Sequence, residues 1–589
     1  MLEKNNNLVA TAISETFNNS DNNYLLGDWC RKVSDFSKNK YSIKFIHEHH
    51  WSDKMKMDDD RDYLETFINL LTFEIGNHLN EIHKINEKNI FWEIILRPWL
   101  FSIIPQIFDR WEICRTFFEK FHGMNFKFHF IKDYKVNHLF SRPLYRVAQM
   151  DDYWNQNIFS RIIEENYLER IKEKKILKSK YVKKEKQNID LKNIIYYPIS
   201  FIDTDLINKN EIIFDTKQTS LFNFLKLSKK LEIFPITSSN FFKRIEKDIE
   251  KSQKVEISKE NLKISLKEKF NNKFEKFCID QIIEDFPEVF LGYFNISRKM
   301  IKKIVNDKKK IIFSNQDIFI NDIYRIWVAT MCGKNSKLVI NTHGGFIPER
   351  YVNFNFQNKV ANKHITWHSL GLHKNEIQLT PLKLVGLKKK KNLQKHLSII
   401  DIELGRYQFR MNSIPTPSEI KVEYDSLVSF IEKLKPKIQN YVKYRTVNNF
   451  GWNFKKKFEK KFGKEKIDKS KNLYELISSS KILVHKYPST PFSESIYLNT
   501  PSVLLYKKDS WRFSPAYNYM LKKLENSKIL FYEPSKLSDH LNDIWDNIDD
   551  WWNSNEVQKT LDDIKNDFIK SKKNWVSEYQ NFFDKLKND

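Results

Sequence analysis

Short apolar runs alternate with helical segments in the second half of the chain, after about residue 335. Runs such as KILV and SVLL are rich in β-branched and aliphatic residues, which is typical of strands buried on both faces. The apolar runs predict strands at residues 337–342, 363–367, 397–403, 440–445, 481–485 and 502–506. Strands that alternate with helices indicate parallel strands joined by crossover helices, and therefore a doubly wound α/β sheet.

The first 330 residues have a more mixed pattern. The segment NNYLLGDWC and residues 127–131 predict buried strands, and residues 58–85 have the apolar spacing of a helix. Residues 151–190 are charged and helical in pattern, and their basic run, 170–186, predicts a solvated helix or a surface linker. Further strands are expected at residues 194–198, 231–235 and 310–314, and helices at residues 245–283 and 317–332.

The most apolar stretch is FWEIILRPWLFSIIPQIF, residues 91–108. A helix that spans a membrane needs about 20 mostly apolar, uncharged residues, whereas this stretch contains Glu93 and Arg97. We therefore expect a buried pair of helices, broken at Pro98 and Pro105, with a segment that dips into a membrane as the alternative.

The tail, residues 535–587, has helical spacing and many tryptophans. We expect these helices to pack back onto an earlier domain. Stacking on nucleic-acid bases is the alternative for so many aromatic residues. Acidic residues between the tryptophans repel phosphate and argue against it: Asp543, Asp546, Asp549 and Asp550.

Length and composition place the chain among folded proteins of several domains. At 589 residues it has room for roughly two to four domains. With 41% hydrophobic and 14% aromatic residues it is not a disordered chain, and 12 Gly and 16 Pro exclude collagen-like and linker-rich classes. We expect an α/β domain with helical insertions at 1–330, a second Rossmann-like domain at 331–534 and terminal helices at 535–589.

Cysteine usage and the first residues indicate a cytoplasmic protein. The four cysteines lie too far apart for a CxxC metal or redox motif: Cys30, Cys114, Cys278 and Cys332. Isolated thiols in a chain of this length predict reduced cysteines inside the cell. The start, MLEKNNNLVATAISETF, lacks the apolar core of a signal peptide.

The net charge is 100 − 75 = +25. A surplus of this size is typical of proteins that bind nucleic acid or an anionic membrane surface. The lysines are spread along the chain together with abundant Asn and Ile, however, so that coding drift explains most of the surplus. A basic nucleic-acid-binding protein or a membrane-surface scaffold is therefore the alternative of a different class.

Three loops that follow predicted strands carry candidate chemistry, since ligands bind at the carboxyl ends of strands in an open α/β sheet. The first is NTHGGFIPER. Gly344 and Gly345 allow the backbone to approach a ligand closely, and His343 is a candidate general base or phosphate donor. A tight turn with a structural histidine is the alternative.

The second loop is ELGRYQFR. Arg406 and Arg410 flank a tyrosine and can clamp a diphosphate or a carboxylate through paired hydrogen bonds. Two surface salt bridges are the alternative. Arg445, at the end of another predicted strand, is a further candidate cation.

The third loop begins HKYPSTPFSESIYLNTP. Ser489 and Thr490 stand where hydroxyls and amides at a helix start can hold an anion, and Glu494 on the first turn can accept hydrogen bonds from ribose hydroxyls. This order is usual in the nucleotide-binding half of glycosyltransferases with two Rossmann domains. An ordinary helix cap at Ser489 or Thr490 is the alternative.

The motifs of P-loop, dinucleotide-binding and HExxH zinc proteins do not occur in the chain. The one DxD sequence, Asp203-Thr204-Asp205, lies outside the clean sheet region. We expect no metal and no resident cofactor.

Several ordered landmarks resemble the transferases encoded in bacterial O-antigen and surface-polysaccharide loci. The similarity spans nearly the whole chain, and paired tryptophans before a short acidic helix are its most distinctive part. The landmarks are LVATAISETF, LLGDWC, WSDKMKMDDDRDYL, RPWLFSIIPQIFDRW, the HGG loop, RYQFR, FGWNFKKKF, YPSTPFSESIYLNTPSVLLY and IWDNIDDWWNSNEVQ.

The resemblance implies two Rossmann-like domains that face a cleft (a GT-B-like fold), related to capsule, sialic-acid and Kdo transferases. It implies a nucleotide-sugar donor, a lipid-linked glycan acceptor and no nucleic-acid partner. It assigns catalysis to His343 and donor binding to Gly344, Gly345, Arg406, Arg410, Ser489, Thr490 and Glu494. We expect the protein to be cytoplasmic and to contact the anionic inner face of the membrane peripherally.

Two departures from the family pattern leave the catalytic base open. Phe346 stands where the family favours a third glycine, and Asn448 and Asn449 stand where it often has an acidic residue. The base is therefore His343 or an acidic residue of the N-terminal half. Transfer of a polyol phosphate or another phosphoryl group, as in teichoic-acid polymerases, is the neighbouring alternative.

Overall fold

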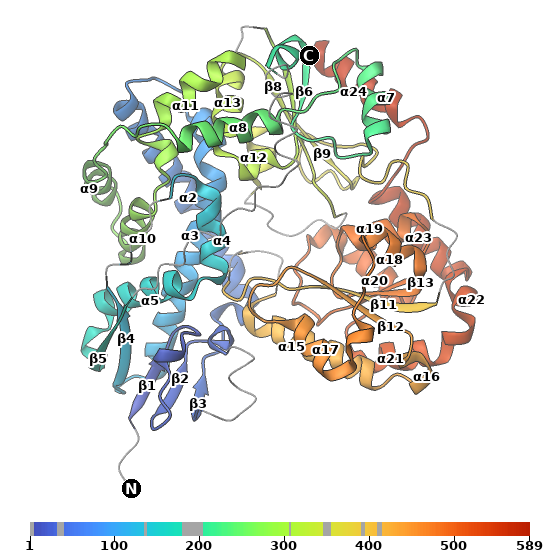
Figure 1. The fold of residues 1–589 in the computed structure, drawn as a ribbon, viewed down its shortest axis with the longest axis horizontal. Coiled ribbons are helices and arrows are strands. Elements are labelled where there is room, and N and C mark those ends of the chain that lie inside the picture. Colours follow the sequence, from blue (N-terminus) through green and yellow to red (C-terminus); the bar gives the residue numbers. More distant parts are fainter. Residues whose placement is uncertain are drawn as a thin grey trace.

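Three five-stranded sheets, each entirely parallel, organise the protein (Figure 1). The structure is a computed structural model. It describes residues 5–31, 41–132, 134, 138–178, 204–304, 308–345, 355–389, 395–408, 411 and 415–588. The α/β class with Rossmann-like sheets is thereby confirmed.

The first sheet has the strand order β3-β2-β1-β4-β5, the order of a Rossmann fold without its sixth strand. Its strands are β1 (Asn6–Val9), β2 (Asn22–Leu25), β3 (Ile43–Ile46), β4 (Phe126–Ile131) and β5 (Ile171–Leu177). The prediction of a helix or linker over 170–186 is wrong for β5, which pairs with β4 along its length. It is an edge strand whose lysines face outward, and its pairing with a strand 45 residues earlier is not a local signal.

A layer of long helices lies between the first and second sheets (Figure 1). These helices are α2 (Lys54–His83), α3 (Asn89–Lys120), α4 (Ser141–Met150) and α5 (Asp152–Asn166). Helix α3 packs against α2, α5 and α13 (Asp322–Gly333). It is long and apolar enough to cross a membrane by composition alone, but 78% of its most apolar stretch is buried inside the protein.

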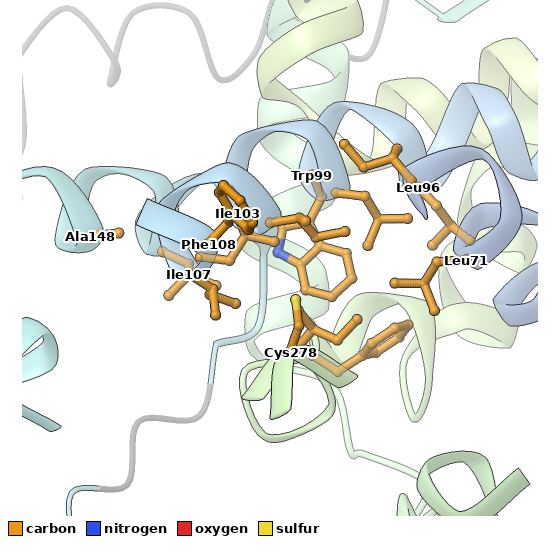
Figure 2. Close-up of a cluster of buried hydrophobic side chains, with 14 of the residues drawn as sticks. Leu71, Leu96, Trp99, Ile103, Ile107, Phe108, Ala148 and Cys278 are labelled. Carbon is orange, nitrogen blue, oxygen red and sulfur yellow. The ribbon is translucent and has the colours of Figure 1, made fainter. Parts of the chain in front are cut away.

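The expected break of this segment into two helices is wrong. Helix α3 runs through Pro98 and Pro105, although a proline inside a helix costs about 3 kcal/mol. The helix stays continuous because it is packed from several sides: Figure 2 shows Trp99 between Leu71 of α2 and Cys278 of α10 (Lys273–Glu284). Burial of this apolar surface offsets the loss of two backbone hydrogen bonds.

The second sheet runs in chain order, β6 to β10, and crosses the expected domain boundary at residue 330, since β7 and β8 are paired neighbours. Its strands are β6 (Ile212–Phe214), β7 (Ile311–Ser314), β8 (Lys337–Asn341), β9 (Lys363–Thr366) and β10 (Glu376–Gln378). The helices of this part of the chain are α7 (Leu221–Lys230), α8 (Ser239–Glu250), α11 (Phe294–Ile301), α12 (Asp317–Ile320) and α14 (Phe356–Val360), together with α9 (Glu260–Glu268), which packs against α2 and α10.

Two predicted strands of this region have different outcomes. Residues 231–235 form no strand, and Glu232 there has a left-handed φ of 56°, which ends helix α7 in a turn. The strand expected at 194–198 lies outside the described residues.

The third sheet has the order β12-β11-β13-β14-β15, the doubly wound arrangement that the sequence predicts. Its strands are β11 (His396–Ile402), β12 (Val442–Val447), β13 (Ser480–His485), β14 (Ser502–Leu505) and β15 (Leu530–Phe531). Its helices are α15 (Pro417–Glu432), α16 (Pro436–Gln439), α17 (Phe454–Phe462), α18 (Leu473–Ser479), α19 (Thr490–Tyr497) and α20 (Asn518–Asn526).

The terminal helices pack back, as expected. They are α21 (Pro534–Ile544), α22 (Ile548–Trp552), α23 (Asn555–Asp567) and α24 (Trp575–Asn588). The first three cover the third sheet, whereas α24 returns to the second sheet and packs Tyr579 and Phe583 against Phe313. Chain end and second sheet therefore lie together at the top of Figure 1.

Candidate functional site

Polar side chains gather where strands β7 and β8 end. His343 lies between two amides: its Nδ1 is 2.8 Å from Asn315 Oδ1, and its Nε2 is 2.8 Å from Gln316 Nε2. Asn315 donates from Nδ2 to the carbonyl of Asn341 at 2.9 Å, which directs its oxygen at the ring. These bonds favour a neutral imidazole with the proton on Nδ1. Burial, followed by the charge of Lys383, lowers the pKa of His343.

The loop that holds His343 is itself organised by a buried carboxylate. Asp215, directly after β6, accepts hydrogen bonds on Oδ2 from the backbone N–H groups of Asn315 (2.6 Å), Gln316 (3.0 Å) and Asp317 (3.1 Å). Three backbone donors on one carboxylate make this turn rigid. Asp215 therefore positions the turn at residues 315–317, and the side chains of Asn315 and Gln316 in that turn hold His343.

The third sheet contributes the start of helix α19, after β13. Ser489 is its N-cap residue, Thr490 its first residue, and Pro491 follows. Proline at this position suits the first turn of a helix, where its missing N–H has no partner to lose. Glu494 is half-buried on the next turn; burial raises its pKa, and Lys383 opposes that rise.

The two predicted loops meet, although they are about 145 residues apart in sequence. A Cβ added to Gly344 would lie 2.3 Å from Thr490 Oγ1 and 3.4 Å from Thr490 Cβ, so that glycine is needed for this approach. Gly345 follows with a left-handed φ of 77°, a conformation that glycine adopts without strain.

Lys383 lies near both loops of the candidate site. Its positive charge lowers the pKa of His343 and opposes the rise in the pKa of Glu494. The predicted residues that the structure places in this one region are His343, Gly344, Gly345, Ser489, Thr490 and Glu494. It combines a neutral imidazole, a carboxylate, a lysine and the amides of a helix start, which together suit an anionic ligand bearing hydroxyl groups.

Arg406 is not part of this region. It is 2% exposed, and its Nη2 forms an ion pair with Asp152 Oδ1 at 2.7 Å. It also donates to the carbonyls of Trp29 and Met150, each at 3.2 Å. The expectation that Arg406 faces a donor phosphate is therefore wrong, since its guanidinium is occupied by this chain. Arg410 lies outside the described residues.

The loop around Arg406 fills the carboxyl edge of the first sheet. The Tyr407 hydroxyl donates to Asp152 at 2.5 Å, and the Tyr407 N–H donates to the carbonyl of Gln149 at 3.1 Å. Arg110 of α3 donates to the carbonyl of Gln408 at 2.6 Å. This edge is where a ligand of a Rossmann-like sheet would bind, and here side chains and backbone of this chain fill it.

Two other sequence landmarks have structural partners. Glu403, at the end of β11, accepts backbone hydrogen bonds from Phe450 (2.7 Å) and Trp452 (2.9 Å) of the FGW segment. Arg445 forms an ion pair with Asp468 at 2.6 Å. Both groups hold segments of the third-sheet region together.

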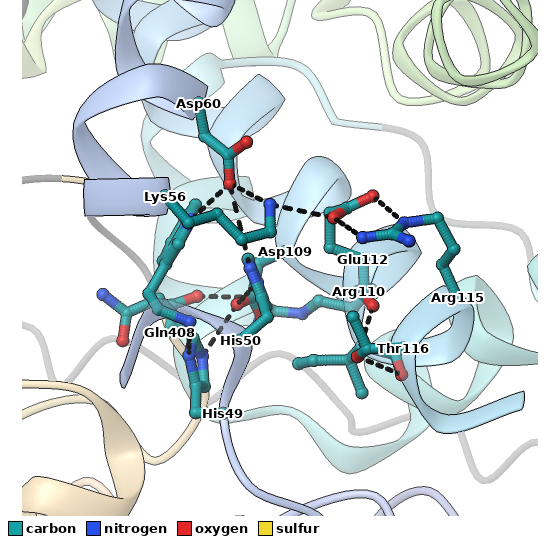
Figure 3. Close-up of polar contacts among 12 residues, drawn as sticks. His49, His50, Lys56, Asp60, Asp109, Arg110, Glu112, Arg115, Thr116 and Gln408 are labelled. Atoms are coloured by element: carbon teal, nitrogen blue, oxygen red, sulfur yellow. Dashed lines mark hydrogen bonds and ion pairs between the residues drawn. The ribbon is translucent and has the colours of Figure 1, made fainter. Parts of the chain in front are cut away.

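A buried cluster with metal-ligand chemistry lies between the first sheet and α3 (Figure 3). His49 Nε2 and His50 Nε2 lie 2.8 Å and 3.1 Å from Asp109 Oδ1, while Arg110 pairs with Asp109 Oδ2 at 3.0 Å. Ligands around a tetrahedral zinc ion stand about 3.3 Å apart, given bonds of about 2.05 Å. The shorter separations, and the guanidinium that already neutralises Asp109, suit an internal ion-pair network better than a divalent cation.

The neighbouring acidic group holds a cation of this chain. Lys56 Nζ lies 2.5 Å from Asp60 Oδ2 and 2.9 Å from Glu112 Oε2, and so stands where a metal ion would bridge the two carboxylates (Figure 3). Of the DxD sequence, Asp203 lies outside the described residues.

Sequence reasoning missed four residues of the candidate site: Asp215, Asn315, Gln316 and Lys383. Asn315 and Gln316 directly follow the predicted strand at 310–314, so that reading every strand end would have found them, whereas Asp215 follows β6, a strand that the sequence did not predict. Lys383 carries no such signal, because it is one lysine among many in a Lys-rich chain.

Comparison with known protein families gives one match. The model of a family described as LIC12162 family transferase matches residues 6–583, nearly the whole chain. No curated protein matches the chain.

Proposed function

We propose that this chain, which belongs to the LIC12162 family of transferases, is a glycosyltransferase of bacterial surface-polysaccharide synthesis. It would move a sugar from a nucleotide-activated donor to a glycan acceptor. The observation that supports this most is the contact of Gly344 with Thr490, because it joins a histidine loop of one parallel sheet to a helix start of another. Such convergence at strand ends is where α/β enzymes bind their ligands.

The second and third sheets would then form the GT-B-like pair, with the first sheet as an added module. Helix α24 supports this pairing, since it leaves the third-sheet side and packs on the second sheet. The filled edge of the first sheet supports its structural role.

Donor binding would use the lysine and the helix start. The charge of Lys383 and the amides at Thr490 neutralise the diphosphate, which carries the negative charge that develops as the sugar leaves. Glu494 accepts hydrogen bonds from ribose hydroxyls. This assignment replaces Arg406 by Lys383 as the phosphate-binding cation.

In the transfer step, the acceptor hydroxyl oxygen forms a bond to the anomeric carbon, and the bond from that carbon to the donor phosphate oxygen breaks. The hydroxyl proton moves to a base, and the electron pair of the broken bond stays on the nucleotide. His343 would take this proton on Nε2, in place of the hydrogen bond that this nitrogen accepts from Gln316, while the Asn315 oxygen holds the proton on Nδ1. Asp317, whose pKa burial raises to about 7, is the acidic alternative beside the same loop.

The first test is a thermal-shift panel of UDP-, GDP-, CMP- and dTDP-sugars. A ligand at 100 times its Kd stabilises the native state by about 2.7 kcal/mol, which raises the Tm of a domain by several degrees. A panel without any selective shift would count against nucleotide-sugar binding.

The second test uses His343→Ala and Glu494→Ala with the donor that the panel identifies. Both should abolish transfer and keep the Tm of the unliganded protein. His122→Ala and Glu525→Ala, at exposed positions elsewhere, are the matched controls. Near-normal turnover of both site variants would refute the site, and a phosphodiester in the product would replace glycosyl transfer by phosphoryl transfer.

A further inference from the structure

Helix α7 exposes large apolar side chains on the side that faces away from its sheet. Leu221, Phe222 and Leu225 are 57%, 75% and 44% exposed, whereas Phe224 and Leu227 of the same helix are buried against the second sheet and α24. The first turns of α7 are therefore apolar on both sides, which a helix in contact with water alone does not need.

Leu221, Phe222 and Leu225 form one group on the helix, since Leu225 lies four residues after Leu221 and three after Phe222. Phe234, just after the helix, is 45% exposed, which places four large exposed apolar residues within 221–234. Single exposed apolar residues are normal on a protein surface, but a contiguous group marks an interaction surface. Figure 1 shows α7 at the outer edge of the molecule, beside α24.

The second half of α7 carries positive charge. Lys226, Lys229 and Lys230 are exposed, and among the described residues none of them forms an ion pair. Apolar residues on one part of a helix and free lysines on the next part match the boundary of a bilayer, where acyl chains adjoin anionic phosphates.

We propose that α7 docks the protein on the surface of an anionic phospholipid bilayer. Leu221, Phe222 and Leu225 enter the boundary between headgroups and acyl chains, and the lysines contact lipid phosphates. The chemistry that recognises the partner is thus apolar insertion combined with phosphate binding.

This surface is close to the candidate site. Gln218, three residues before α7, is hydrogen-bonded to Asn341 at the end of β8. Asn223 of α7 donates to the carbonyl of Val385 at 3.1 Å, two residues from Lys383. Docking through α7 would bring the site to the membrane, where a lipid-linked acceptor lies. The docking itself does not depend on the reaction, and its failure would leave the proposed function intact.

Co-sedimentation of the full chain with vesicles tests the proposal. Vesicles of phosphatidylcholine alone are compared with vesicles of phosphatidylcholine and phosphatidylglycerol in equal parts. The wild type should pellet with the anionic vesicles, and added salt should weaken this binding. Neutralising the three lysines to Gln should lower the partition coefficient by about fivefold per lysine.

The apolar variant is Leu221→Ser/Phe222→Ser/Leu225→Ser, which should lose vesicle binding while keeping its Tm. Leu70→Ser/Phe73→Ser removes a comparably exposed apolar pair from α2 and should bind as the wild type does. Equal pelleting of wild type with both vesicle types, or unchanged binding by the α7 variants, would overturn the proposal. If the triple Ser variant binds vesicles as the wild type does but has a lower molecular mass in light scattering, the surface is an interface between two copies of the chain.

Discussion

Gly344→Ala tests the contact that joins the two loops of the candidate site. The backbone of Gly344 lies outside the left-handed region, so the added methyl group itself is tolerated, and the penalty comes from its neighbour. The new Cβ would stand 2.3 Å from Thr490 Oγ1, more than 1 Å closer than the ordinary contact of 3.4 Å that it makes with Thr490 Cβ. Forcing such an overlap costs about 1–3 kcal/mol.

Thr490→Ala relieves this overlap, because it removes Oγ1 and leaves Cβ at an ordinary contact distance of 3.4 Å. The double variant Gly344→Ala/Thr490→Ala should therefore be more stable than the sum of the single changes by about 1–2 kcal/mol. Thermal unfolding of the four proteins measures this, since 1 kcal/mol shifts the Tm of a domain by about 2–4 °C. Gly333→Ala is the control, because its Cβ meets no atom within 4 Å.

The result that would refute this reasoning is additivity. If the double variant equals the sum of the two single variants within about 0.5 kcal/mol, the HGG loop and helix α19 do not touch. Destabilisation of Gly333→Ala by as much as Gly344→Ala would show that the loss is a general effect of replacing glycine.

Three further variants test separate parts of the structure. Asp152→Ala leaves Arg406 buried without its carboxylate and should destabilise the protein by about 3–5 kcal/mol in urea unfolding, whereas a loss under 1 kcal/mol would show that the pair is solvated. Asp215→Asn should lower turnover by about 100-fold while the donor still raises the Tm, because it displaces the loop that holds His343; unchanged turnover would remove its positioning role. Burial lowers the pKa of His485 to about 3, below its unfolded value near 6.5, so its contribution to stability is present above pH 6.5 and is lost as pH falls toward 3. His485→Leu should therefore retain about 2 kcal/mol more stability than the wild type on going from pH 7.5 to pH 5, and parallel losses in the two proteins would contradict the shift.

Four of the five strands of the third sheet were predicted from sequence, since β11, β13 and β14 are almost fully buried apolar runs and β12 alternates buried and half-exposed residues; the two-residue strand β15 was missed. Each predicted strand from residue 397 onward matches an observed one within two residues at its start. Continuous β-branched runs bounded by turn residues leave few alternatives in that region. The same rule placed the HGG loop and α19 at strand ends, but their meeting depends on the packing of two different sheets, the second and the third, which no local pattern shows.

Features that depend on long-range contacts escaped prediction. Strand β5 reads locally as a basic surface segment and becomes a strand through pairing with β4. Helix α3 continues through two prolines because the surrounding helices pack against it. The sequence of α3 alone does not show which helices will surround it.

The role of Arg406 shows the limit for site residues. An arginine after a strand can bind a phosphate or a carboxylate of the same chain, and local sequence does not distinguish these. Its partner Asp152 is 254 residues away. Lys383 shows the converse, because the lysine that we propose to bind phosphate stands among 100 Lys and Arg residues without a distinguishing local pattern.

The position of a bound nucleotide-sugar in a crystal structure tests the central claim most directly. The proposal predicts density for the diphosphate beside Lys383 and the N–H groups at the start of α19, with the ribose near Glu494 and the sugar toward His343. Density at the carboxyl edge of the first sheet, with Arg406 released from Asp152 to hold the phosphates, would contradict it.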